Sequence, residues 1–312
     1  MNTIYLVTHN SVFHADEVMA TAILFNTFGK DNHLELIRTN NPTDYLGNDD
    51  AIIYDIGLGK YDHHQKGGNG ARENGVPYAA CGLIWKDFGS VCIKNVISDM
   101  KLDIDEDDIQ LIADIIDKNI IQGIDANDNG YHPDDIPSIS NFTISNIVSS
   151  FNNTIYYGGV SHIKQNSNFR DAVSICRDIL NANIKRLADS ISLQNELMEI
   201  IENRDDEHIL VLGRYIPWTK CVVENTTDDE IWFVVYPSSR NEGEWNMQAV
   251  PISTDSFEQR HSVPESWWGG NKETLPKITG ISGARFCHQS NGFLTTAASF
   301  EDIMNLAKIA CQ

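Results

Sequence analysis

Residues 52–67 of this chain read Ile-Ile-Tyr-Asp-Ile-Gly-Leu-Gly-Lys-Tyr-Asp-His-His-Gln-Lys-Gly, and the rest of the sequence is best interpreted outward from them. The first three residues are apolar and predict a short buried strand that ends at Asp55. Two glycines then let the chain turn before the Asp-His-His group at 62–64. Carboxylate oxygens and neutral imidazole nitrogens together bind divalent metals, so this stretch predicts part of a metal site.

Strands and helices alternate through the first part of the chain. Apolar patterns predict strands at 4–8, 34–38 and 51–55 and helices at 16–28, 79–88 and 105–118. This alternation favours an α/β fold with a mostly parallel sheet and flanking helices. Ligands of such sheets gather at the carboxyl ends of the strands. His9 and Asp55 each lie just past a predicted strand, so we expect them on the same rim.

The second part of the chain has a different pattern. Residues 127–166 are rich in Asn, Ser, Gly and Pro and predict a long irregular segment, whereas 168–203 predict one long helix or a broken pair. That helix either links two domains or is an ordinary core helix. Strands at 209–212, 231–236 and 247–252 without long helices between them indicate an antiparallel sheet, and 300–310 a final helix. We expect a catalytic domain at 1–203, including the linking helix, and a smaller α+β domain at 204–312.

Length and composition limit the class of protein. A chain of 312 residues exceeds one typical domain, and no run of 18 apolar residues predicts a membrane span. The first residues already resemble a core strand, so we expect no targeting segment. Six cysteines without a CxxC pair indicate reduced thiols, argue against a zinc ribbon and favour a cytoplasmic location.

The formal net charge of −21 restricts the partners of this chain. An acidic surface repels a polyanion, so extended binding to duplex DNA is not expected. A small nucleotide or short single-stranded RNA, with its phosphate held by metal ions, is compatible with this charge. The alternative is that the charge only keeps the protein soluble. The oligomeric state stays open, with a homodimer as one alternative.

Two clusters carry the candidate metal ligands. His9 lies at a strand tip, and His14 and Asp16 lie on the turn into the next helix, so three ligand types occur within eight residues. In the second cluster, His63 and His64 are adjacent and cannot point the same way on a regular strand. One imidazole can therefore bind metal while the other faces a substrate. The alternative interpretation of this second cluster is an exposed polar loop.

A late acid completes the predicted set. Asp125 is favoured over Asp128 for this role, although either could cap a local turn. The predicted metal ligands are His9, His14, Asp16, Asp55, His63 and Asp125. These are more ligands than one tetrahedral zinc ion with an open position needs. The set fits two ions about 3.5–4 Å apart, bridged by Asp55, which would activate water for attack on phosphorus. Mixed carboxylate and imidazole ligation favours Mn²⁺, with Mg²⁺, Zn²⁺ or Co²⁺ as alternatives.

Several short motifs in this order resemble one family. They are Thr8-His9-Asn10, Phe13-His14-Ala15-Asp16-Glu17, Arg38-Thr39, Tyr54-Asp55-Ile56-Gly57, Asp62-His63-His64-Gln65, Cys81-Gly82-Leu83-Ile84-Trp85, Ile124-Asp125-Ala126 and Asp128-Asn129-Gly130. Together they resemble the Myg family (melanocyte-proliferating-gene type), a branch of the DHH phosphoesterase superfamily often labelled metal-dependent protein hydrolases. The resemblance runs nearly end to end, because Phe286-Cys287-His288 and Asn291-Gly292-Phe293-Leu294 resemble the family's C-terminal motif.

The resemblance implies a fold and a set of roles. It implies a DHH-type α/β domain that carries the metals and a smaller C-terminal domain that closes over the substrate. One metal site would comprise His9, His14 and Asp55, and the other Asp16, Asp55, His63 and Asp125. The predicted catalytic residues are Asp55, Asp62 and His64, with His64 near the scissile phosphate. Arg285 and His288 are predicted phosphate contacts, with local packing as the alternative role.

The C-terminal part departs from the family pattern. Relatives tend to have Trp-Arg-Gly-Leu-Arg where this chain has Trp267-Trp268-Gly269-Gly270-Asn271, and Phe-Ile-Gly-Gly where it has Phe293-Leu294-Thr295-Thr296. Losing arginines removes bidentate phosphate donors, and losing glycines limits close backbone approach to a ligand. The sequence therefore supports the metal half of the site more fully than the substrate half.

These observations lead to one expected function and two alternatives. The expected function is a divalent-metal-dependent phosphoesterase that hydrolyses phosphodiester bonds of RNA oligonucleotides or small nucleotides. The resemblance further implies the activity of a 3′–5′ RNA exonuclease. One alternative is a phosphomonoesterase or pyrophosphatase that uses the same ions. The other is a metal-binding regulatory protein that has lost turnover, which the altered residues Trp268, Thr295 and Thr296 keep open.

Overall fold

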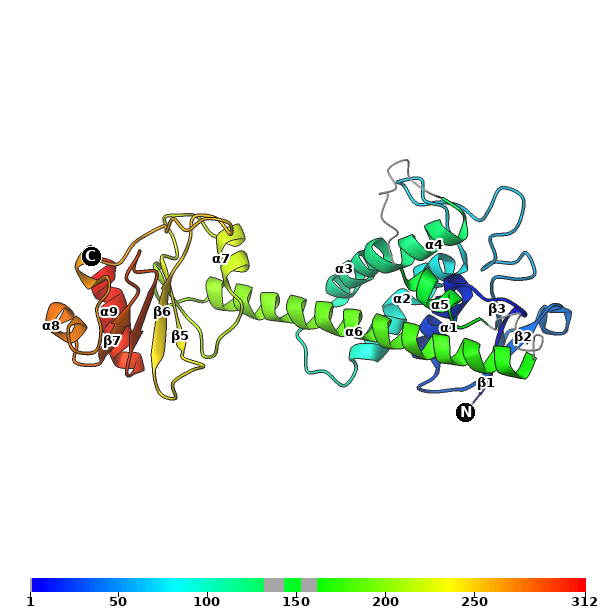
Figure 1. The fold of residues 1–312 in the computed structure, drawn as a ribbon, viewed down its shortest axis with the longest axis horizontal. Helices are drawn as coiled ribbons and strands as arrows, with labels where there is room; N and C mark the ends of the chain where they lie inside the picture. Colours follow the sequence, from blue (N-terminus) through cyan, green and yellow to red (C-terminus); the bar gives the residue numbers. More distant parts are fainter. Residues whose placement is uncertain (1, 132–142, 153–161) are drawn as a thin grey trace. The chain divides into compact units, whose positions relative to one another are not determined.

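The computed structural model describes residues 2–131, 143–152 and 162–312 (Figure 1). The chain divides into two compact units, residues 1–191 and 192–312, which we call unit 1 and unit 2. The division falls within the long helix α6 (His162–Glu202). The sequence placed the domain boundary at residue 203, just after this helix ends. Each unit is described by itself below.

Unit 1 contains a three-stranded parallel sheet in the order β2-β1-β3. Its strands are β1 (Thr3–His9), β2 (His33–Thr39) and β3 (Ala51–Ile53). Central strand β1 buries Leu6 and Val7 completely, as expected for a strand covered on both faces. The α/β class and the parallel sheet predicted from the alternating pattern are confirmed.

Helices make up most of the rest of unit 1 (Figure 1). They are α1 (Ala15–Phe28), α2 (Ala80–Ile97), α3 (Glu106–Ile116), α4 (Gln122–Asp128), α5 (Ile144–Ser149) and the first part of α6. A π-helical turn, Asp117–Ile121, joins α3 to α4. Helix α1 is apolar nearly all round and lies buried, with Phe13 just before it packed edge-on against Phe169 of α6.

Two details of unit 1 differ from the predicted elements. Helix α2 extends nine residues beyond the predicted end at 88, because Cys92, Ile93 and Ile97 continue its buried face. The segment 127–166, predicted to be irregular, includes α5, which Thr143 caps by accepting a hydrogen bond from the Asn146 backbone N–H. The same predicted segment also includes 132–142 and 153–161, which lie outside the described residues.

Unit 2 contains a five-stranded sheet in the order β4-β5-β6-β8-β7. Its strands are β4 (Ile209–Val211), β5 (Phe233–Pro237), β6 (Trp245–Ala249), β7 (Ala284–Cys287) and β8 (Leu294–Ala297). The predicted antiparallel arrangement holds from β5 to β7, but β4 and β5 pair in parallel. The reason is the crossover through α7 (Thr219–Asn225), which returns the chain in the same direction.

Helices cover both faces of the unit 2 sheet. Helix α9 (Phe300–Ala310), predicted at these residues, packs on the face that carries Val235 and Met247. Helix α7 packs on the opposite face, against Val234 and Tyr236. The remaining short helices of the described chain are α8 (Leu275–Thr279) and the 3₁₀ turns Thr43–Tyr45 and Glu265–Trp267.

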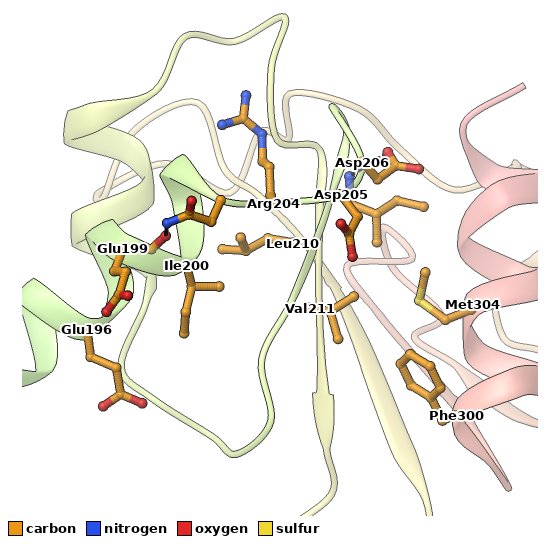
Figure 2. A pocket seen from close by; sticks show the side chains of 12 residues that line it. Glu196, Glu199, Ile200, Arg204, Asp205, Asp206, Leu210, Val211, Phe300 and Met304 are labelled. Atoms are coloured by element: carbon orange, nitrogen blue, oxygen red, sulfur yellow. Dashed lines mark hydrogen bonds between the residues drawn. The ribbon is translucent and has the colours of Figure 1, made fainter.

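Figure 2 shows a pocket of about 720 Å³ in unit 2, between the last turns of α6, strand β4 and α9. Leu210, Val211, Phe300 and Met304 are among the apolar residues that line it. Within the described residues, no helix combines the length and the apolar character needed to cross a membrane. The six cysteines are free thiols, as their spacing predicted.

Candidate metal centre

The sheet topology of unit 1 places two predicted ligands next to each other. Strands β1 and β3 are parallel neighbours in which Val7 pairs with Ile53, so the residues that follow each strand emerge at the same edge. His9 ends β1 and Asp55 follows β3. Their side chains meet there, with His9 Nε2 3.2 Å from Asp55 Oδ2.

Asp55 occupies an unusual backbone conformation. Its φ is +55°, in the left-handed region that aspartate tolerates better than most residues. Its N–H donates a hydrogen bond to the carbonyl oxygen of Tyr61 at 2.9 Å, which fixes the turn between the strand and the following loop. The buried side chain then points one oxygen at His9 and the other at His63, whose Nε2 lies 3.4 Å from Asp55 Oδ1.

Two histidines are oriented through their Nδ1 atoms. Nδ1 of His9 lies 2.8 Å from the carbonyl oxygen of Asn10, and Nδ1 of His63 lies 3.1 Å from Oδ1 of Asn129. Both partners are acceptors, so a proton on each Nδ1 satisfies these bonds and leaves Nε2 as the ligand atom. Nε2 of His63 also lies 3.1 Å from Oδ2 of Asp128.

The start of α1 adds a carboxylate that the sequence analysis did not assign to the site. Glu17 is fully buried, and its Oε1 lies 2.9 Å from Nε2 of His9. Both of its oxygens also accept from the backbone N–H of His14 at 3.1 Å. A glutamate directly after Asp16, three residues beyond a helix-capping histidine, was the available signal. The His14 side chain itself is 58% exposed, with Nδ1 4.0 Å from Oδ1 of Asp128.

Two acids of the predicted set sit at the N-terminus of α2. Asp16 accepts from the backbone N–H groups of Ala80 at 2.9 Å and Cys81 at 2.6 Å. Asp125 accepts from the backbone N–H of Gly82 at 3.0 Å and from the Cys81 thiol at 3.2 Å. The N–H groups and the dipole of a helix N-terminus favour the charged form of these carboxylates. Burial outweighs this effect and raises the pKa of both acids, that of Asp125 to about 6.

The late acid that faces the histidines is Asp128. Asp125, the residue favoured from the sequence, uses one oxygen at the α2 N-terminus and the other in an ion pair with Nη1 of Arg72 at 2.8 Å. Arg72 also contacts Asp117 through two hydrogen bonds, of 2.6 and 2.7 Å. Asp128 lies one helical turn after Asp125 and directs its oxygens at His63 and His14.

Asp62 and His64 form a dyad beside this cluster. Nδ1 of His64 lies 2.8 Å from Oδ1 of Asp62, whose other oxygen accepts from the backbone N–H of Leu58 at 2.6 Å. Burial raises the pKa of Asp62, but the hydrogen bonds from His64 and Leu58 outweigh it and leave the pKa below its usual value. The aspartate therefore fixes the imidazole, which is 58% exposed, through its Nδ1 atom.

These groups border an open cavity of about 520 Å³. Its lining is His9, His14, Asp55, His64, Asn127 and Asp128. The structure thus brings together most of the predicted residues of unit 1. Arg285 and His288 belong to unit 2, where their hydrogen bonds are local. Arg285 donates to the carbonyls of Ser282 and Ala284 at 3.4 Å, and His288 bonds to Asn291 at 3.2 Å.

Mutual attraction between imidazoles and carboxylates dominates the electrostatics. Burial lowers the pKa of both His9 and His63, but neighbouring carboxylates outweigh it. Asp55 and Glu17 raise the pKa of His9 to about 11. Asp128 and Asp55 raise the pKa of His63 to about 11 as well. Burial raises the pKa of Asp55, yet the two histidines lower it to about 2. Protonated imidazoles therefore supply the positive charge that these acids require in the metal-free protein.

The donor set fits divalent cations. Asp55 Oδ1 and His63 Nε2 are buried, and neither has a hydrogen-bond partner among the described residues. Buried polar atoms normally make hydrogen bonds, so these two atoms, 3.4 Å apart without a hydrogen bond between them, could instead hold a cation. Groups whose ligand atoms lie within 4.8 Å of one another are His9-His14-Glu17, Asp55-His63-His64, Asp16-His63-Asp128 and Asp16-Cys81-Asp125. Shared members connect the last three groups into one centre rich in oxygen and nitrogen donors.

Comparison with known proteins identifies the family. Residues 5–311 match the family MYG1_exonuc, described as "Uncharacterised protein family (UPF0160)", and the chain belongs to this family. It is 28% identical to a MYG1 protein of Schizosaccharomyces pombe, over 99% of this chain and 98% of the relative. It is 27% identical to a MYG1 protein of Saccharomyces cerevisiae, with 98% and 95% covered. Identity to the MYG1 exonuclease of Homo sapiens is 25%, with 96% and 84% covered.

Proposed function

We propose that this chain is a divalent-metal-dependent phosphoesterase that hydrolyses phosphodiester bonds of short single-stranded RNA, as a 3′–5′ exonuclease does. The observation that carries the proposal is the position of Asp55, whose two oxygens face two imidazoles from different segments. A carboxylate placed in this way is suited to bridge two cations. Relatives named MYG1 exonuclease over nearly the whole of this chain support the reaction class.

The residues that would hold the cations follow from the contacts. His9, His14 and Asp55 would hold one ion, with Glu17 beside His9. Asp16, Asp55, His63 and Asp128 would hold the other. When bound, two divalent cations supply positive charge to a phosphoryl group and lower the pKa of water. The mixture of carboxylates and imidazoles favours Mn²⁺ among the available metals.

The protein groups around this centre have separate tasks. Asn10 and Asn129 hold the imidazoles of His9 and His63 with Nε2 toward the acids. His64, fixed by Asp62 and exposed at the cavity, is placed to contact the scissile phosphate or to give a proton from Nε2 to the leaving oxygen. The open cavity admits a chain end, whereas the net charge of −21 disfavours a long duplex.

Hydrolysis of three substrates tests the proposal. Purified protein loaded with Mn²⁺ is assayed with bis-p-nitrophenyl phosphate, p-nitrophenyl phosphate and a short end-labelled RNA. We expect cleavage of both diesters, with mononucleotides released from the 3′ end of the RNA. Cleavage of the monoester alone would instead identify a phosphomonoesterase. Metal binding without turnover on any substrate would identify a regulatory metal-binding protein.

A further inference from the structure

The unit 2 sheet carries a row of side chains that crosses four strands. Tyr236 on β5 pairs with Asn246 on β6, Asn246 with Thr296 on β8, and Thr296 with Phe286 on β7. Paired residues on neighbouring strands point to the same face, so the row extends about 14 Å across the sheet. This face lies opposite α9, because the sequence neighbours Val235, Met247 and Cys287 pack in the core with that helix.

The row lies in a cavity of about 410 Å³ that contains exposed aromatic rings. Phe286 at one end of the row is 41% exposed. At the other end Tyr215, 53% exposed, covers Tyr236 with a ring-to-ring distance of 5.2 Å. Single exposed apolar side chains are common on proteins, but two large rings that line one cavity indicate a binding surface.

Polar groups lie between these rings. In the part of the chain that the structure describes, the side chains of Asn246 and Thr296 have no hydrogen bond to another residue. The amide offers donors and an acceptor, and the hydroxyl offers one of each. Glu244, whose carboxylate accepts from Nδ2 of Asn241 at 2.6 Å, adds a further acceptor at the cavity. Flat rings separated by such groups match the faces and edges of nucleobases.

The charge at this cavity suits a phosphate. Arg240 lines it from the turn between β5 and β6, and among the described residues no ion pair engages its guanidinium. In a chain of net charge −21, an arginine that has no ion pair and lies beside aromatic rings is suited to bind a phosphate. The larger pocket in Figure 2 differs, because four acids border it (Glu196, Glu199, Asp205 and Asp206) and its arginine, Arg204, is already paired with Glu230 at 3.1 Å. The cavity of Arg240 has one acid, Glu244.

We propose that this cavity binds the bases and a phosphate of a short single-stranded RNA. Bases stack on Tyr215 and Phe286, Asn246 and Thr296 bond to their edges, and Arg240 contacts the phosphate. Every base has a face that stacks, so binding of this kind tolerates any sequence. That tolerance suits an enzyme that removes successive nucleotides. This inference rests on the proposed function for its choice of RNA, but it concerns a separate site in unit 2.

Binding without turnover tests the inference. Fluorescence anisotropy of a labelled short oligoadenylate is measured with full-length protein in EDTA, so that no hydrolysis occurs. Tyr215→Ala and Phe286→Ala should each weaken binding by about 5- to 150-fold, the range for loss of one stacked base. Phe286→Trp, which keeps a ring, should retain binding. Arg240→Gln should weaken binding and reduce its salt dependence.

The matched control is Phe257→Ala. Phe257 is 93% exposed and lies outside the cavity lining, so its loss should leave the affinity unchanged. With Mn²⁺ present, the two cavity variants should raise KM for RNA more than they lower kcat. The inference is overturned if the alanine variants bind as the wild type does, or if an abasic oligomer of the same length binds equally well.

Failure of the proposed function has a different signature. If wild-type protein binds the oligoadenylate through Tyr215 and Phe286 but hydrolyses no phosphodiester with Mn²⁺, the proposed function is wrong and the RNA site stands. If Mn²⁺-dependent hydrolysis of bis-p-nitrophenyl phosphate is observed without ring-dependent RNA binding, the RNA site is wrong and the phosphoesterase stands.

Discussion

The Oδ1 atom of Asp55 lies 3.4 Å from Nε2 of His63, and neither atom has a hydrogen-bond partner among the described residues. The other oxygen of Asp55 lies 3.2 Å from Nε2 of His9. One buried carboxylate thus links the last residue of β1 to the loop after β3. The left-handed backbone conformation of Asp55 sets this orientation. Such conformations cost conformational free energy and occur most often at functional sites.

Replacing Asp55 should remove metal and activity together. Asp55→Asn keeps the size of the side chain but removes the charge that faces both histidines. Loss of an outer-shell partner already weakens metal sites about 10–100-fold, so loss of this residue should weaken Mn²⁺ binding by more than about 100-fold. Diester hydrolysis should fall below detection while circular dichroism shows an intact fold. Metal content and hydrolysis rate are measured on the same preparation.

The exposed residue Asp49 supplies the control, since Asp49→Asn makes the same chemical change away from the centre. This variant should bind Mn²⁺ and turn over as the wild type does. Wild-type activity in Asp55→Asn would show that Asp55 does not bridge the metals.

The sequence predicted the positions that depend on short-range patterns. Strand ends place His9 and Asp55 on one edge because parallel strands all end on the same side, and that can be inferred from the alternation of elements. The choice between Asp125 and Asp128 depends on the rotational phase of α4. The π-helical turn at 117–121 changes this phase, and Arg72 neutralises Asp125 from a distant part of the chain. Neither effect has a local sequence signal.

Unit 2 was predicted less completely for a similar reason. Strands β7 and β8 have four residues each, and α7 has seven, which is too short for periodicity to distinguish strand from helix. Without α7, the parallel pairing of β4 with β5 could not be inferred. The row that ends at Phe286 depends on the register of four strands, and register over long sequence separations is set by tertiary packing.

Metal binding should release protons. In the metal-free protein His9 and His63 have pKa values raised to about 11, so both are protonated at pH 7, and each must lose a proton before Nε2 can bind a cation. Affinity for Mn²⁺ should therefore rise with pH from 6.5 to 8. Calorimetry in two buffers of different ionisation enthalpy should show the release of about two protons per protein, one from each imidazole. Equal heats in both buffers would contradict this prediction.

The same pKa shifts determine how the metal-free protein responds to alkali. Both histidines have a folded pKa above the unfolded value of about 6.5, so their contribution to stability is complete below pH 6.5. That contribution is lost as the pH rises toward about 11. The urea midpoint of EDTA-treated protein should therefore fall between pH 7 and pH 10. A midpoint that rises over this interval would show that the imidazoles are not held as cations.

Asp125 and Asp128 should give opposite phenotypes when each is changed to Asn. Asp125→Asn breaks the buried ion pair with Arg72 and should lower the free energy of unfolding by up to about 3–5 kcal/mol. The loss should be smaller if Asp117 alone still pairs with Arg72. Asp128→Asn should change stability less but weaken Mn²⁺ binding by at least about 10-fold, because Asp128 faces His63. Urea unfolding and Mn²⁺ titration of both variants separate the two roles. Stronger metal loss in Asp125→Asn would restore the assignment favoured from the sequence.

Gly82 should be required for the close approach of α2 to Asp125. A Cβ atom added at Gly82 would lie 1.9 Å from Oδ2 of Asp125, the oxygen that binds Arg72. Gly82→Ala should therefore displace this carboxylate and lower the free energy of unfolding by about 1–3 kcal/mol, despite the better helix propensity of alanine. Gly123→Ala in α4 is the matched control, because a Cβ there meets nothing within 4 Å and should leave stability equal or higher. Thermal melting of both variants measures the difference. Equal melting temperatures would show that α2 shifts freely to accommodate the methyl group, and that the Asp125 position is not fixed by this contact.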